Sequence, residues 1–162
     1  MKDLKNAYRK MNIRKFVYSL AIVMLSYDVL STLIASKLYG RFADLSPIHN
    51  FLGQKSPTCF CILIAIVIAS LIFSFLVALS CIEGKRLSDR LFILCCDFFA
   101  VYLLIFEAIA VPHNTLVLFG SYGIVLSSEM FLIQEIASAL IAGVIVVVVD
   151  WKMIQKASYM LY

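Results

Sequence analysis

Residues 58–82, TCFCILIAIVIASLIFSFLVALSCI, run through the middle of the chain without one charged side chain. A helix needs about 20 consecutive, mainly apolar residues to cross the hydrocarbon core of a bilayer. Three further stretches reach this length, at about residues 16–39, 91–111 and 130–151. None alternates between apolar and polar residues as the strands of a membrane barrel would. The sequence therefore predicts an all-α integral membrane protein, built as a four-helix bundle.

The composition agrees with this class. Hydrophobic residues make up 63% of the chain and its mean hydropathy is +0.98, whereas soluble domains contain roughly 45–50% apolar residues. No linker, low-complexity tract or internal repeat stands out, so residues 1–162 are expected to form a single membrane domain. The bilayer is the expected partner, and the net charge of +4 is better explained by orientation in it than by binding of nucleic acid.

The distribution of lysine and arginine predicts the orientation. Cytoplasmic loops of membrane proteins carry an excess of these residues. Eleven lie before the first predicted helix, between the second and third, or after the fourth, and three lie in the other two loops. We therefore expect a multi-pass protein of the cell membrane with both termini cytoplasmic. The eleven are Lys2, Lys5, Arg9, Lys10, Arg14, Lys15, Lys85, Arg86, Arg90, Lys152 and Lys156.

Three acidic residues inside the predicted spans, Asp28, Glu107 and Glu135, are the candidate functional acids. Inserting such a residue costs on the order of 2.5–3.5 kcal/mol, which makes it a functional hypothesis by default. Each acid is a protonated hydrogen-bonding group, a proton-exchanging site or a cation ligand, and a purely structural bond between helices is the alternative. Asp97 and Asp150, nearer the cytoplasmic ends, are interpreted as interfacial residues.

Two helices place these acids on stripes of small and hydroxylated residues. In the first helix Asp28 shares a face with Ser31 and Thr32, whose hydroxyl groups are expected to bond its carboxyl group. In the fourth, Glu135 shares a face with Ser138 and with a small-x-x-x-small pair suited to close helix packing, formed by Ala139 and Gly143.

The relative depth of the acids follows from the predicted helix ends. Glu107 lies about one turn before the end of the third helix, and Glu135 about one turn after the start of the fourth. In antiparallel neighbours both would lie at a similar outer depth, with Asp28 below them near the membrane midplane.

The outer loops hold further candidate polar residues. Both histidines of the chain fall there, but no H-x-x-x-H or H-E-x-x-H spacing indicates a zinc site, so we expect no metal and no cofactor. Residues 116–126 (LVLFGSYGIVL) are apolar but too short to span, which suggests an interfacial or re-entrant segment. The polar candidates are Asp44 and His49 in the first outer loop and His113, Asn114 and Glu129 in the second.

The first helix and the loop after it carry a short motif: Tyr27-Asp28, Thr32, Gly40 and then Asp44-Leu45-Ser46-Pro47. Over about residues 20–50 it resembles a family of uncharacterised small membrane proteins of archaea and bacteria. That family has Asp-x-x-x-Thr in its first helix and, after a glycine, Glu-x-Asn-Pro, where this chain has Asp44 and Ser46. The resemblance implies a shared site that includes Asp28, Thr32, Asp44 and Pro47, and it implies no activity.

Three classes of function remain open, in order of preference. The first is an interaction or assembly protein, as a homo-oligomer or in a larger membrane complex. The second is a proton- or cation-coupled transporter or channel that uses the intramembrane acids. The third is an intramembrane hydrolase with an acidic pair as general acid and base. An enzyme is the least favoured of the three.

Overall fold

The computed structural model describes residues 2–39, 55–82, 86–119, 128–151 and 155. Within these ranges the regular structure consists of four α-helices: α1 (Lys2–Tyr39), α3 (Pro57–Ser80), α4 (Leu87–Leu118) and α5 (Ser128–Val149). Each contains a segment long and apolar enough to cross a membrane. The prediction of an all-α chain with four such helices is confirmed.

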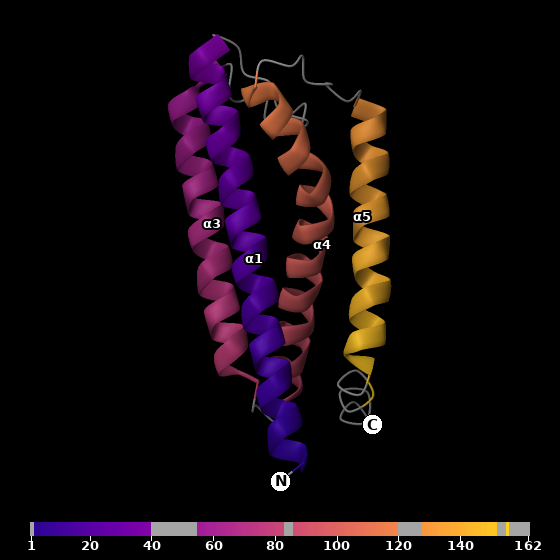
Figure 1. The fold of residues 1–162 in the computed structure, drawn as a ribbon. Coiled ribbons are helices and arrows are strands. Elements are labelled where there is room, and N and C mark those ends of the chain that lie inside the picture. Colours follow the sequence, from indigo (N-terminus) through magenta and orange to yellow (C-terminus); the bar gives the residue numbers. More distant parts are fainter. Residues whose placement is uncertain (1, 40–54, 83–85, 120–127, 152–154, 156–162) are drawn as a thin grey trace.

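The helices alternate in direction along the bundle (Figure 1). α1 and α4 run the same way and pack most extensively against each other, α3 packs against both, and α5 packs mainly on α4. The first residues of α1 and the last residues of α5 therefore lie at the same end, which we call the terminal end. The opposite end is called the distal end.

Two helices are longer than the sequence predicted. α1 begins at Lys2 rather than near residue 16, because the basic stretch 2–15 contains no glycine or proline and consists largely of good helix formers. α4 does not stop at residue 111 but continues through Pro112 to Leu118, and it curves in its distal part (Figure 1). The Thr115 hydroxyl donates to the Val111 carbonyl at 2.7 Å, a bond type that bends helices and helps them to accommodate proline in membranes.

The core lies where α1, α3 and α4 meet, toward the terminal end. Ala21 and Ala100 are fully buried, and such small side chains let helix backbones approach closely. The Tyr18 ring stacks on Phe75 of α3, with centroids 4.3 Å apart. The buried cluster comprises Tyr18, Ala21, Phe75, Ala78, Ile93, Cys96 and Ala100.

α5 is attached to α4 by a row of aromatic rings. Phe98, Tyr102 and Phe106 follow each other at four-residue spacing on α4 and stack pairwise. Phe131 of α5 meets the Phe106 ring edge-on, with centroids 5.9 Å apart. The remaining surface of α5 is largely apolar and exposed.

Candidate functional site

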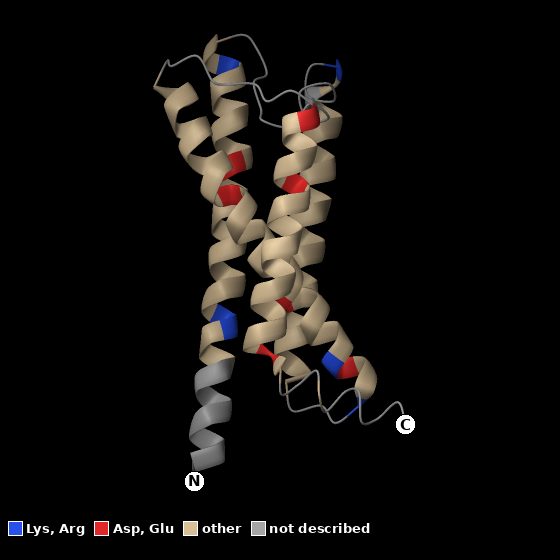
Figure 2. Ribbon diagram, turned by 90° about the vertical axis from the view of Figure 1, so that its right-hand side faces the viewer, with Lys and Arg blue, Asp and Glu red and all other residues tan. Residues whose placement is uncertain are grey.

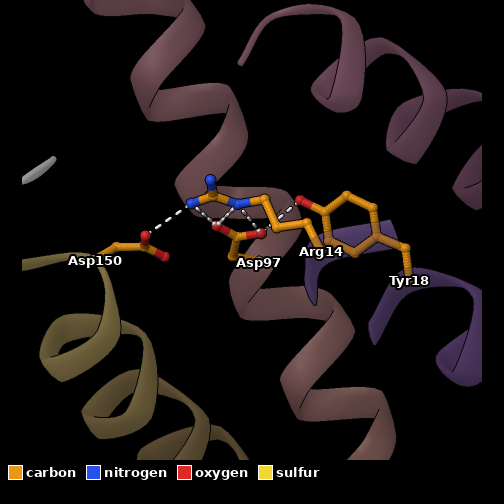
Figure 3. Close-up of polar contacts among 4 residues, drawn as sticks. All are labelled: Arg14, Tyr18, Asp97 and Asp150. Carbon is orange, nitrogen blue, oxygen red and sulfur yellow. Dashed lines mark hydrogen bonds and ion pairs between the residues drawn. The ribbon is translucent and has the colours of Figure 1, made fainter. Parts of the chain in front are cut away.

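A buried cluster of charges joins three helices near the terminal end (Figure 3). The Arg14 Nε atom of α1 donates to both carboxylate oxygens of Asp97 on α4, at 2.8 and 3.1 Å. The Arg14 Nη2 atom lies 2.7 Å from an oxygen of Asp97 and 2.7 Å from an oxygen of Asp150. The Tyr18 hydroxyl donates to Asp97 at 2.5 Å. One guanidinium group thus binds two carboxylates from different helices.

Local structure explains how these side chains meet. Arg14 and Tyr18 lie one turn apart on α1 and so face the same way. Asp97 lies on the side of α4 that also buries Ile93 and Ala100. Asp150 directly follows α5, where its backbone N–H still donates to Val146 at 2.9 Å. Arg14 therefore links α1 to both α4 and α5.

Sequence reasoning did not connect these residues: it counted Arg14 with the basic residues that flank the first helix and interpreted the two aspartates as interfacial. In the structure the side chains of Arg14, Asp97 and Asp150 are in contact and only 13%, 9% and 5% exposed. The reason is that α1 extends to Lys2, which places Arg14 within the helix and level with Asp97.

A second polar group lies in the seam between α1 and α4 toward the distal end. The Asn114 amide donates to the Asp28 carboxylate at 2.5 Å and to the Thr32 hydroxyl at 2.8 Å. Asp28, Thr32 and Asn114 are all buried. The Asn114 oxygen lies 2.9 Å from Nδ1 of His113. Sequence reasoning named Asn114 only as a loop residue, because it ended the third helix before Pro112.

The polar stripe of α1 is buried, but one expected contact is wrong. Ala21, Asp28, Ser31, Thr32 and Ala35 all face inward. The Ser31 hydroxyl, however, donates to the backbone carbonyl of Asp28 at 2.8 Å, not to its carboxyl group. The Thr32 hydroxyl accepts from Asn114. A serine three residues along a helix reaches the carbonyl of its own turn more easily than a side chain beside it.

The other two candidate acids lie on different sides of α4. Glu107 is 1% exposed and precedes Asn114 by two turns, so it faces the same α1 side about 10 Å nearer the terminal end. Glu135 of α5 accepts a hydrogen bond from Tyr102. Tyr102 and Glu107 are five residues apart, which turns them about 140° from each other around the α4 axis.

The acids are spread along the bundle. Figure 2 shows acidic residues at several heights along it, with lysine and arginine toward its ends. Asp28 meets Asn114, which lies two turns beyond Glu107 on α4, so Asp28 lies on the distal side of Glu107 rather than below it. The reason is that α4 continues past Pro112.

The remaining candidates are dispersed. Asp44 and His49 lie outside the described residues, as do Ser46 and Pro47 and most of segment 116–126. The beginning of that segment belongs to α4. His113 also lies within α4 rather than in a loop, and Glu129 is exposed in the first turn of α5. Among the described residues, no three His, Cys, Asp or Glu side chains gather as metal ligands.

The stripe on α5 serves packing within the chain. Ser138 and Ala142 are buried, and Ala139 and Gly143 are half-buried. A side chain added at Gly143 would have its Cβ atom 3.9 Å from the Phe98 ring. The Ala139–Gly143 pair thus lies against α4.

Together these features define a class: a four-helix protein with membrane-spanning length, whose buried polar groups bridge neighbouring helices. No known protein family, curated protein or solved structure matches the chain. The resemblance around Asp28 and Thr32 thus gains no support from these comparisons.

Proposed function

We propose that this chain is a multi-pass integral protein of the cell membrane, with both termini cytoplasmic, and that it acts in assembly. In this role it associates with copies of itself or with other subunits of a membrane complex and has no catalytic activity of its own. The terminal end, at which the basic residues of 2–15 begin the chain, then faces the cytoplasm.

The observation that carries this proposal is a pair of small residues left uncovered on α3. Ala65 and Ala69 are one turn apart and both exposed, among exposed isoleucines at positions 62, 66 and 72. Small residues at this spacing let the backbone of another membrane helix approach closely. Another small pair, Ala139 and Gly143, packs toward Phe98 of α4 within the chain. Ala65 and Ala69, by contrast, are exposed and so available to a partner.

The contacts that the buried polar groups make within the chain support the same function. Arg14 binds Asp97 and Asp150, Asn114 binds Asp28, and Tyr102 binds Glu135. These contacts tie α1, α4 and α5 together, which is the structural use of intramembrane polar residues. A bundle that is tied together inside and apolar outside suits a subunit that docks laterally in the membrane.

The test is the assembly state of the full-length chain in mild detergent. Ala65→Phe and Ala69→Phe place a bulky ring in the proposed contact, and Ala108→Phe is the matched control because Ala108 is an exposed alanine on α4. We expect light scattering after size exclusion, together with co-purification from native membranes, to show an assembly that the α3 variants disrupt and Ala108→Phe preserves. A monomer that captures no membrane partner would reject the proposal.

A second function, cation- or proton-coupled transport, is favoured by one observation. Asp28 and Glu107 are both buried, Asp28 on α1 against Asn114 of α4 and Glu107 on the same side of α4 as Asn114. Glu135 does not continue this line, because it bonds Tyr102 on another side of α4. A path would thus depend on two acids, not three.

A further inference from the structure

A cavity of about 260 Å³ lies between α1, α4 and α5, beside the charge cluster. α5 packs mainly on α4, and within the described ranges it makes no extended contact with α1. α4 thus forms the floor of the cavity, and α1 and α5 form its two walls. Ile13 of α1 and Val149 of α5, which line the cavity, are 51% and 62% exposed. The cavity therefore opens sideways, between α1 and α5, to the surroundings of the bundle.

The exposed lining of this cavity is almost wholly apolar. Arg14, Asp97 and Asp150 border it, but Arg14 is directed at the two carboxylates, and the three residues add almost no polar surface to the cavity. A ligand there meets hydrocarbon and not hydrogen-bonding groups. The aliphatic residues of the lining are Ile13, Val17, Val101, Ile145, Val146 and Val149.

The polarity and the length of the cavity decide what can fill it. A buried water molecule needs two to four polar partners, which this lining does not offer. The lining residues cover about one turn of each helix, roughly 6 Å along the axis, as Ile145 and Val149 do on α5. A helix docked in a groove is anchored over at least about two turns, so the cavity is too short for one. An empty cavity would leave the lining atoms without contacts on one side, and a thin aliphatic chain restores them.

We propose that the cavity binds one acyl chain of a membrane phospholipid, which enters between α1 and α5 and lies against the valines and isoleucines. Ile13 and Val17 are four residues apart on α1, so the strip that they form runs along the helix axis, as acyl chains run in a bilayer. The cavity contacts the chain and not the head group. This inference rests on the membrane location proposed above but not on the assembly role.

The experiment is photo-crosslinking of the purified full-length chain in lipid nanodiscs. The probe is a trace of phosphatidylcholine that carries a diazirine in the middle of one acyl chain. After illumination, peptide mass spectrometry measures lipid adducts at Val101, which lines the cavity on α4. Adducts at Leu140 report contact with the bulk bilayer, because Leu140 is 67% exposed on α5 and does not line the cavity. We expect adducts at both positions in the unmodified chain.

Substitutions at the opening of the cavity separate the bound chain from the bulk lipid. Val149→Phe should lower the ratio of Val101 to Leu140 adducts about fivefold, because the ring takes up space that the chain needs. Val148→Phe is the matched control, since Val148 is 71% exposed and does not line the cavity, and it should keep the ratio within about twofold. Ile145→Phe fills the cavity from another position if Val149→Phe does not fold. The same probe with a phosphatidylglycerol head group should give an unchanged ratio.

Four results would overturn the proposal. The first is labelling of Leu140 without labelling of Val101 in the unmodified chain. The second is an equal ratio in Val149→Phe, Ile145→Phe and Val148→Phe. The third is a ratio that differs several-fold between the two head groups, because the cavity would then not recognise the chain alone. Absence of adducts at both positions would overturn the membrane location and this inference with it. The first three results leave the proposed function and its assembly test on α3 unaffected.

Discussion

Replacing Arg14 by glutamine should destabilise the bundle more than any other single change in its charged residues. The substitution removes the guanidinium group that lies between Asp97 and Asp150. Both carboxylates are at least nine-tenths buried in their side chains, so water cannot replace the lost partner. α5 would also lose its ionic connection to α1.

The size of the effect follows from the contacts. Arg14 makes charge-assisted hydrogen bonds of 2.7 to 3.1 Å to Asp97 and a further one of 2.7 Å to Asp150. Removing one partner of a buried ion pair typically costs about 3–5 kcal/mol, mainly because a charge is left buried. We expect Arg14→Gln to lower the free energy of unfolding by about this amount.

The assay is unfolding of the purified chain in mixed maltoside and dodecyl sulfate micelles, followed by circular dichroism. A triple variant, Arg14→Gln with Asp97→Asn and Asp150→Asn, neutralises the whole cluster and should recover most of the loss, because no buried charge is then uncompensated. Lys15→Gln is the control, since Lys15 is exposed on the next position of α1. A loss below about 1 kcal/mol, as for a surface pair, or a triple variant less stable than Arg14→Gln, would refute the reasoning.

Further predictions concern Asn114, Asp28 and Gly143. Asn114→Leu removes the donors to Asp28 and Thr32, and it should lower the free energy of unfolding by about 1–3 kcal/mol in the same assay. If the chain transports cations, Asp28→Asn should leave folding intact and abolish cation uptake into proteoliposomes. Uptake that persists in this variant would exclude Asp28 from any transport path. Gly143→Ala places its Cβ atom in ordinary contact with Phe98 and should be neutral or stabilising by up to about 1 kcal/mol. Gly143→Leu should lower the free energy of unfolding by about 1–3 kcal/mol, because the larger side chain forces α5 away from α4. Val144→Leu, at an exposed position, is the control, and equal stability of these two leucine variants would contradict the prediction.

Periodicity predicted which residues face inward better than it predicted what they contact. The inward face of α1, with Asp28, Ser31 and Thr32, follows from spacing along a single helix and is buried as expected. The partner of Asp28 does not follow from such spacing. Asn114 comes from another helix, and it reaches Asp28 only because α4 continues past a proline that the sequence suggested as its end.

The same limit explains the charge cluster. A lysine- and arginine-rich stretch before an apolar helix is typical of a cytoplasmic flank, and nothing in the order of residues separates Arg14 from Lys15. In the structure Lys15 is exposed and Arg14 is not. A signal did exist: Arg14 and Tyr18 are one turn apart, and both carry donors that suit a buried acid.

The amino-acid sequence by itself determined the number of helices, their apolar character and the polar faces of α1 and α5, because these depend on length and on 3.6-residue periodicity within one segment. Only the tertiary structure decided the register between helices: Arg14 with Asp97 and Asp150, Asp28 with Asn114, and Glu135 with Tyr102. The register between two helices depends on how their alanines and aromatic rings pack against each other and on the bend of α4. These packing contacts join segments that lie far apart in the chain.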